Sequence, residues 1–162
     1  MVAELLAETG ARPDGILVDI GPGSFTGVRV GLAAARAFGL AWGCAVDGVP
    51  ADALVARAAF ALANAPDRVA VVLDALRGEV FARAWDRDGP CGPLRAMVPG
   101  DAADWVDEIG AAAGNGLALL RPRAGWRDPR GPSSASAVLL RPGDLVPAHP
   151  LYIRAPDAKP QA

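Results

Sequence analysis

The segment 21–27, Gly-Pro-Gly-Ser-Phe-Thr-Gly, has the composition of a turn that binds anions. Glycine permits positive φ angles and close approach of the backbone, and a serine or threonine oxygen caps the helix that follows. Such a turn directs backbone N–H groups at phosphate or carboxylate near the positive end of a helix. The candidate residues for this anion or nucleotide site are Gly21, Gly23, Ser24 and Thr26. The segment lacks the Gly-Lys-Ser/Thr of a P-loop and the glycine spacing of the dinucleotide fingerprint, so a purely structural turn is the favoured alternative.

Histidine, serine and cysteine residues give little basis for catalysis or metal binding. His149 is the only histidine, so the paired imidazoles of a helical zinc site are absent, and we interpret it as a surface residue. A Ser-His-Asp triad would need His149 with Ser24 or a serine of the segment 133–136, and nothing in their spacing favours it. Cys44 and Cys91 form no Cys-x-x-Cys motif and fit a reducing compartment. We therefore expect no catalytic set and no metal site.

Length and charge limit the classes of protein that fit. The 162 residues, 52% of them hydrophobic, suffice for one sizeable domain or two small lobes. The formal net charge of −2 gives no global basic field, so any RNA substrate would be held mostly by another molecule. The first residues lack the pattern of a signal peptide, and no apolar run has the length and hydrophobicity of a membrane span. We expect a cytoplasmic protein that does not enter a membrane.

The first third of the chain alternates between helical and extended patterns. Residues 2–8 predict a short helix that ends at Gly10. The apolar run 15–20 predicts a buried strand, the segment 25–42 a helix, and the segment 44–49 a second strand. A strand, a helix and a strand in this order predict a parallel pair with a crossover helix. The glycine-rich turn then lies between the first strand and its helix.

The remaining elements are expected to be shorter. Asp74 ends an apolar strand, and we interpret it as a turn residue that accepts a hydrogen bond from the backbone two positions further on. Glu79 is interpreted as a residue of the same hairpin. The pattern predicts a helix over 52–63, a hairpin of strands 68–73 and 80–85, a turn over 86–93, a helix capped by Asp101 and ending at Ile109, a turn over 114–116, an irregular segment over 121–132 and an extended tail over 149–162.

Small residues recur at four-residue spacing along the predicted helix 25–42. They are Gly27, Gly31, Ala35, Gly39 and Gly43, which form a ridge on one helix face. Each glycine inside a helix costs about 0.5–1 kcal/mol relative to alanine, so close packing should recover that cost. The ridge either packs on the chain's own sheet or forms a subunit interface together with Leu5 and Leu6. The residues alone leave both interpretations open.

Three blocks of sequence are similar to those of one known family. The segment 21–32 resembles the glycine-rich signature of the TsaB (YeaZ) family, the segment 74–81 its Asp-Ala-Arg-Arg-Gly-Glu-Val-Tyr block, and the segment 150–154 its closing Pro-x-Tyr-Leu-Arg. The resemblance implies an α/β fold of two lobes of the actin-like, ribonuclease-H-like (ASKHA) class. Mapped onto this chain, it implies a first lobe over 1–64 that is incomplete at its N-terminus, a second lobe over 65–148 and an extended tail over 149–162.

The same resemblance implies a function and its partners. It implies a non-catalytic dimerisation and activating subunit in the synthesis of N6-threonylcarbamoyladenosine at position 37 of tRNA. The partners would be the transferase TsaD and the ATPase TsaE, with a homodimer when the chain is alone and tRNA contacted only through the complex. ATP would be used by the complex, and no cofactor is assigned to this chain. The resemblance places the partner interface at Leu5, Leu6, Gly27, Val28, Gly31, Leu32, Ala35 and Gly39.

Two enzymatic alternatives remain beside this expectation. A nucleotide-binding ATPase of actin-like fold would use the glycine-rich turn, with Asp74 as a ligand of magnesium. A glycoprotease-like enzyme would need the paired histidines that the sequence lacks.

Overall fold

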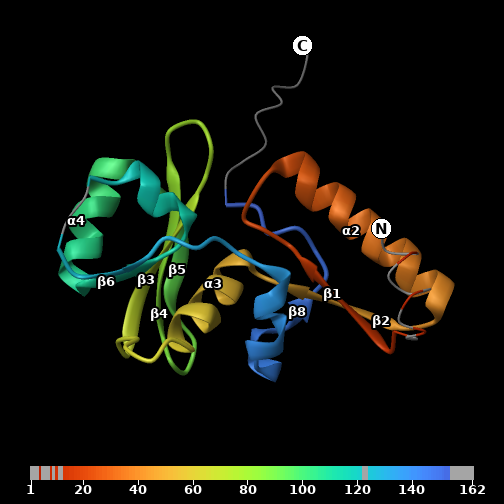
Figure 1. Ribbon diagram of the computed structural model, residues 1–162. Helices are drawn as coiled ribbons and strands as arrows, with labels where there is room; N and C mark the ends of the chain where they lie inside the picture. Colours follow the sequence, from red (N-terminus) through yellow and green to blue (C-terminus); the bar gives the residue numbers. More distant parts are fainter. Residues whose placement is uncertain (1–3, 5–7, 9, 11–12, 122–123, 154–162) are drawn as a thin grey trace, which may run out of the picture.

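The structure is a computed structural model that describes residues 4, 8, 10, 13–121 and 124–153. Its strands form two separate sheets with helices on their faces, and α3 lies between the sheets (Figure 1). The first sheet has the order β1-β2-β8 and the second the order β5-β4-β3-β6-β7. No helix within the described ranges is long and apolar enough to cross a membrane.

The first sheet contains the predicted parallel pair and its crossover helix. Its elements are β1 (Gly15–Asp19), α2 (Phe25–Trp42), β2 (Ala45–Val49) and β8 (Val146–Pro147). β1 and β2 are parallel, while β8 pairs antiparallel with β2. The Ser24 side chain caps α2 by accepting a hydrogen bond from the Gly27 N–H, and Gly43 ends the helix in the left-handed conformation. The predicted bounds of this helix are confirmed.

The second sheet carries the predicted hairpin and three strands that the sequence patterns did not predict. Its strands are β3 (Arg68–Asp74), β4 (Val80–Asp86), β5 (Pro90–Met97), β6 (Ala111–Ala113) and β7 (Trp126–Asp128). The antiparallel hairpin of β3 and β4 is confirmed. The turn predicted over 86–93 was wrong in its second half, because β5 begins at Pro90. β5 is an edge strand with a register shift against β4, and such a position tolerates proline and glycine.

Two further predictions for this half of the chain are corrected. α4 (Pro99–Ile109) begins after Val98, which occupies the cap position without a side-chain hydrogen bond. Asp101 therefore lies in the first turn and does not cap the helix, although its charge suits the positive end of the dipole. The segment predicted to be irregular contains β7, which pairs parallel with β6. These strands are three residues long, too short to show a period in the sequence.

α3 (Ala51–Phe60) and the segment near the C-terminal end connect the two sheets. α3 packs in one core cluster with strands of the second sheet, and nearly all of its residues are buried. The short helices η2 (Ser134–Leu139) and η3 (Pro142–Asp144) precede β8, and η1 (Asn115–Leu119) follows β6. η2 packs against α3 before the chain returns to the first sheet. The division of lobes at residues 64 and 65 stays a prediction; in the structure α3 packs against the second sheet, and β8 pairs with β2 of the first.

Candidate partner interface

The C-terminal half of the small-residue ridge packs against the chain's own sheet. Leu32, Ala35 and Gly39 are buried on the inward face of α2. A Cβ atom at Gly39 would lie 2.5 Å from Cγ2 of Val46 on β2, so only glycine fits this close approach. These three predicted interface residues therefore belong to the described core of the first sheet. Leu5 and Leu6, also predicted for the interface, lie outside the described residues.

The N-terminal half of the ridge is not required by this packing. Gly27 is exposed and Gly31 is half-buried. Val28, which was predicted for the interface but is not part of the ridge, packs against the core of the first sheet. A Cβ atom at Gly31 would meet only Cγ2 of Val18, at 3.9 Å, which is an ordinary van der Waals contact. An alanine would therefore fit at Gly31, and the packing within the chain does not explain why glycine stands there.

The side of α2 that points away from the sheet is apolar and uncharged. We call this surface the outward face; it consists of Gly27, Val30, Gly31, Ala34, Ala37, Phe38 and Ala41. Val30 is 62% exposed, and Phe38 stacks on Trp42 with ring centroids 4.8 Å apart. Positions 30, 34, 37 and 41 follow one another at steps of four, three and four residues, which is the spacing of a helix that packs along another helix. The outward face is therefore suited to a helical partner.

The two arginines of α2 lie to one side of the outward face and bind the C-terminal segment. Arg29 donates from Nε to the hydroxyl oxygen of Tyr152 at 2.8 Å, and Arg36 donates from Nη2 to the carbonyl of Ala148 at 2.8 Å. The Arg29 guanidinium also lies over the ring of Phe25, 3.7 Å from its centroid. The charges of the helix are thus turned toward residues 148–152, and the outward face is left without charge.

The first and third of the blocks that resemble the TsaB family lie in direct contact. The Leu151 N–H donates to the carbonyl of Ile20 at 2.8 Å, directly before the glycine-rich turn. Gly21, with a φ of +97°, brings its backbone against the Leu151 carbonyl, and a Cβ there would lie 3.4 Å from that oxygen. Phe25 and Tyr152 extend this contact, with ring centroids 5.4 Å apart. The closing segment of the chain therefore supports the start of α2.

The second block forms the loop between β3 and β4. The Asp74 carboxylate accepts a hydrogen bond from the Leu76 N–H at 2.7 Å, so the predicted turn role of Asp74 is confirmed. The Asp74 N–H in turn donates to the Asn115 side chain. Leu76 and Arg77 both have a φ of +58°, a conformation that residues with side chains seldom adopt. Leu76 is 55% exposed, so this loop presents an apolar side chain to the surroundings.

Two N–H groups of the glycine-rich turn are engaged within the chain. The Gly21 N–H donates to the Asp19 carboxylate at 2.7 Å, and the Gly27 N–H donates to Ser24. Burial raises the pKa of Asp19, the Gly21 hydrogen bond acts in the opposite direction, and the negative charge of Asp52 raises it further. Gly23, Ser24 and Thr26 are exposed while Gly21 is buried. The anion site at these four residues stays a prediction.

Buried ion pairs on α3 are the polar feature that the sequence analysis missed. Asp52, fully buried, accepts hydrogen bonds from Arg83 Nε and Trp85 Nε1, each at 2.7 Å. Both donors bind the oxygen Oδ2, and the buried Oδ1 has no hydrogen-bond partner in the described structure. Arg57 forms a paired contact with Asp144 at 2.8 Å. The sequence contained a sign of these ion pairs, because Asp52 and Arg57 are the only charged residues in α3, which is otherwise apolar.

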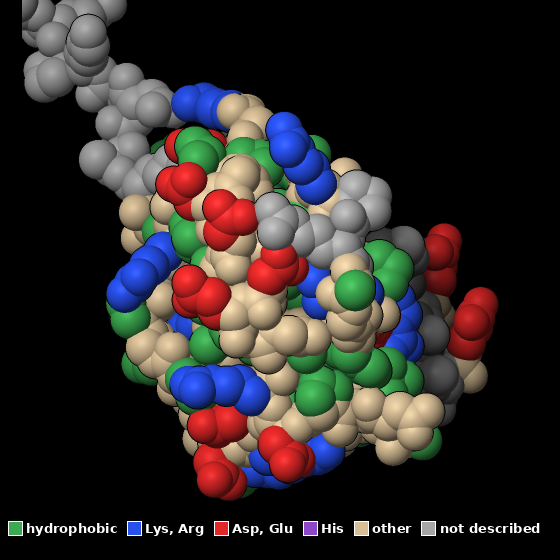
Figure 2. All heavy atoms as spheres, turned by 90° about the vertical axis from the view of Figure 1, so that its left-hand side faces the viewer, with side chains coloured by type: hydrophobic (Ala, Val, Ile, Leu, Met, Phe, Trp, Pro, Cys, Tyr) green, Lys and Arg blue, Asp and Glu red, His purple; other side chains and the backbone are tan. Residues whose placement is uncertain are grey.

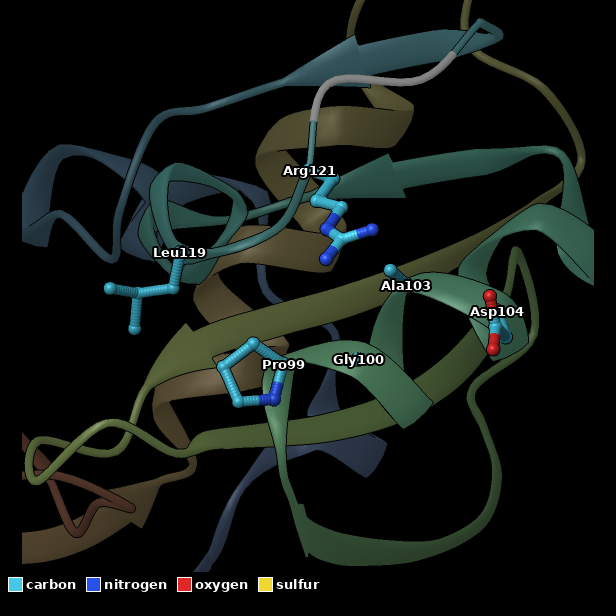
Figure 3. A pocket seen from close by; sticks show the side chains of 6 residues that line it. All are labelled: Pro99, Gly100, Ala103, Asp104, Leu119 and Arg121. Carbon is cyan, nitrogen blue, oxygen red and sulfur yellow. The ribbon is translucent and has the colours of Figure 1, made fainter.

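A hollow of about 420 Å³ lies over the second sheet, between the start of α4 and the segment that follows η1. The Arg121 side chain points into it between Leu119 and Ala103, as Figure 3 shows. None of the predicted site residues lines this hollow. On the side of the molecule that carries α4, Arg side chains are interspersed with Asp and Glu (Figure 2). That surface therefore presents no continuous basic track.

Comparisons with known proteins agree on the family. Residues 1–119 match the family model described as TsaD, tRNA N6-adenosine threonylcarbamoyltransferase. An uncharacterised protein of Mycobacterium tuberculosis is 36% identical over 168 residues, which cover 96% of this chain and 71% of that protein. The tRNA threonylcarbamoyladenosine biosynthesis protein TsaB of Haemophilus influenzae is 42% identical over 86 residues, covering 50% of this chain and 35% of that protein.

Solved structures agree on the fold. The structure of YeaZ from Pseudomonas aeruginosa is similar with a TM-score of 0.75 and 27% identity, covering 94% of this chain and 82% of that chain. A second P. aeruginosa structure, described as a protein with similarity to peptidase YEAZ, gives a TM-score of 0.76 with 26% identity, covering 95% of this chain and 81% of that chain. The chain thus belongs to the family that the TsaD model describes, and within it is a TsaB-like (YeaZ-like) protein with the actin-like α/β fold.

Proposed function

We propose that this chain is a non-catalytic subunit in the synthesis of threonylcarbamoyladenosine in tRNA, and that it binds a TsaD-type transferase through the outward face of α2. The observation that carries the proposal is the apolar, uncharged surface of this helix from Gly27 to Ala41. Soluble proteins seldom leave a whole helix face apolar unless another molecule covers it. The name of the H. influenzae relative, a tRNA threonylcarbamoyladenosine biosynthesis protein, indicates the process in which we look for that molecule.

The shape of the outward face supports a helix as its occupant. Because the side chains at positions 34, 37 and 41 are alanines, the backbone of a partner helix can approach α2 closely. Val30 and Phe38, which are exposed on the same face, provide larger apolar contacts. Hydrogen bonds at both ends fix the length of α2, so binding requires little ordering of the helix itself.

The arrangement of polar groups favours this proposal over an ATPase. A phosphate site at the glycine-rich turn would need free N–H groups, and those of Gly21 and Gly27 already donate within the chain. A magnesium site at Asp74 would compete with the hydrogen bond from the Leu76 N–H. In the proposed complex, ATP is consumed by a TsaE-type ATPase, and tRNA is bound through the transferase in the cytoplasm.

Substitution of Ala37 by glutamate tests the docking surface. A carboxylate in the centre of the outward face would be buried without a partner charge, so we expect binding to the transferase to weaken by at least about a hundred-fold. Calorimetric titration of the chain into a TsaD-type protein from the same genome measures the affinity. Ala118→Glu is the matched control and should bind normally, because Ala118 is an exposed alanine of η1, which contacts the second sheet.

Reconstitution tests the role in tRNA modification. The chain alone should show no turnover of ATP or peptide, and should restore modification when mixed with the transferase, the ATPase, threonylcarbamoyl-adenylate and tRNA. Hydrolysis of ATP or a peptide by the chain alone at ordinary enzyme rates would contradict the proposal. Normal binding of the Ala37→Glu variant would contradict the assigned surface.

A further inference from the structure

The cluster of Phe25, Arg29 and Tyr152 holds one guanidinium in a fixed orientation beside the outward face of α2. Arg29 is stacked 3.7 Å above the Phe25 ring, and its Nε atom donates to Tyr152. The Phe25 and Tyr152 rings are 46% and 45% exposed, so the cluster lies at the surface. This arrangement restrains a side chain that is otherwise among the most mobile in a protein.

The donors that point away from Tyr152 remain available for a ligand. Of the Arg29 nitrogens, Nε makes the hydrogen bond within the described structure, and no such bond is formed by Nη1 or Nη2. Two N–H groups in a plane form the fork that binds a carboxylate through two parallel hydrogen bonds. Arg36, seven residues further on, differs in this respect because its Nη2 is engaged by the Ala148 carbonyl. Only one of the two α2 arginines is therefore both restrained and open at its tip.

We propose that Arg29 is a preoriented receptor for a carboxylate on the partner protein, placed at the edge of the apolar outward face of α2. The inference rests on the proposed function, because it uses the same docking surface. It specifies the partner as a helix whose apolar stripe is bordered by an aspartate or glutamate near its contact with the first turns of α2. A restrained guanidinium loses less side-chain entropy on binding. An ion pair at Arg29 would also fix the position of the partner helix along α2, which the alanines of the outward face alone do little to define.

Phosphate is the other anion that such a fork binds, and the chain's charge argues against it. Binding of a nucleic acid requires several cationic side chains along one surface. The chain has a net charge of −2, and the neighbouring Arg36 is engaged by the carbonyl of Ala148. A single fixed guanidinium next to an apolar surface instead matches the composition of protein interfaces, in which arginine and aromatic residues are enriched.

Affinity for the TsaD-type transferase in Arg29 and Tyr152 variants tests the proposal. Arg29→Gln should weaken binding about ten- to hundred-fold, and Arg29→Lys should lose nearly as much because lysine keeps the charge without the planar fork. Tyr152→Phe keeps the charge and releases the guanidinium, so a loss of about two- to ten-fold is expected. Arg36→Gln is the matched control and should bind within about two-fold of the parent chain.

Two further measurements separate recognition from folding. The affinity of the parent chain should fall with rising salt, and Arg29→Gln should show a shallower dependence. Replacing each acidic residue along the transferase's docking helix in turn should identify one whose effect vanishes in the Arg29→Gln background. Affinity losses that only follow a lowered melting temperature would mean that the cluster serves the fold, and would overturn the proposal.

Two outcomes distinguish this inference from the proposed function. Normal binding of Arg29→Gln together with lost binding of Ala37→Glu would overturn the carboxylate receptor and leave the docking surface intact. Normal binding of both variants would overturn both. Binding to phosphate is tested by titrating the chain alone with a tRNA anticodon stem-loop. Binding that is lost in Arg29→Gln there, without any change toward the transferase, would assign Arg29 to phosphate instead.

Discussion

The helices α2 and α3 follow one another in the chain and treat charge in opposite ways. α2 carries two arginines at its margin and leaves its outward face apolar toward the surroundings. α3 is nearly all buried, and its two charged residues form ion pairs inside the molecule. Buried charges with fixed partners hold two parts of one chain in a defined orientation. An exposed apolar helix face is unfavourable in water, and a partner that covers the face removes this unfavourable exposure. The contrast separates the helix that organises the chain from the helix that we propose meets its partner.

The largest expected effect is the loss of the buried pair of α3. Asp52→Ala leaves Arg83 without its partner and the Trp85 N–H without an acceptor. Removing one member of a buried ion pair costs about 3–5 kcal/mol in the free energy of unfolding. Urea denaturation followed by circular dichroism measures it. Asp67→Ala, which removes an exposed partner of Arg87, is the control and should cost less than about 1 kcal/mol. Equal losses would mean that α3 is not organised by its buried charges.

The next effect divides the small-residue ridge of α2 into its two halves. Gly39→Val places a branched side chain against Val46 and should destabilise the fold by about 1–3 kcal/mol through overpacking. Gly31→Ala has room for the added methyl group and should stabilise the helix by about 0.5–1 kcal/mol. Thermal unfolding compares the two variants. A destabilised Gly31→Ala would indicate that this position also belongs to the core of the chain.

The smallest expected effect is the loss of stability at low pH that comes from the ion pair between Arg57 and Asp144. Burial alone would raise the pKa of Asp144, but hydrogen bonds from Arg57 and from the Arg141 N–H outweigh it and hold the pKa below its usual value. A lowered pKa in the folded state means that the ion pair contributes fully above the unfolded pKa, about 3.9, and that this contribution is lost as the pH falls through the folded value. Melting temperatures between pH 6 and pH 2 should therefore fall less steeply in Asp144→Asn than in the parent chain, over the range of about pH 4 and below. Parallel curves would place the acid sensitivity elsewhere.

Sequence patterns predicted the β1–α2–β2 unit and the β3–β4 hairpin well because their elements are long or bounded by strong signals. The expectation that β1 is a buried strand was wrong, since Val18 is its one buried residue. The helix 25–42 has a serine at its start and a glycine at its end, and both act as caps. β6, β7 and β8 were not predicted, since strands of two or three residues depend on neighbours that are distant in the sequence. β5 was not predicted for a different reason: its prolines and glycine are typical of a turn, and they are tolerated in a strand because β5 lies at the sheet edge.

The predicted partner interface on this helix stays a prediction, and the structure divides its residues between the core and the surface. Four-residue spacing identified a ridge, and spacing alone gives no sign of which side of a helix faces its own sheet. Leu32, Ala35 and Gly39 are buried and face inward, while Gly27 and Gly31 belong to the outward face. The link between Arg29 and Tyr152 joins residues 123 positions apart, so no local pattern encodes it.

The return of β8 to the first sheet bears on how the protein is made. The antiparallel neighbour of β2 (residues 45–49) is β8, which is formed by residues 146–147 and is synthesised about 100 residues later. All strands of the second sheet, in contrast, lie within residues 68–128. On the ribosome, the second sheet can therefore assemble while the first is still unfinished, and the last step is the closure of a contact of long sequence separation. Until that closure α2 lacks the segment that Arg29 and Arg36 bind, so a partner that recognises the finished helix would bind only after residues 148–152 have been synthesised and packed.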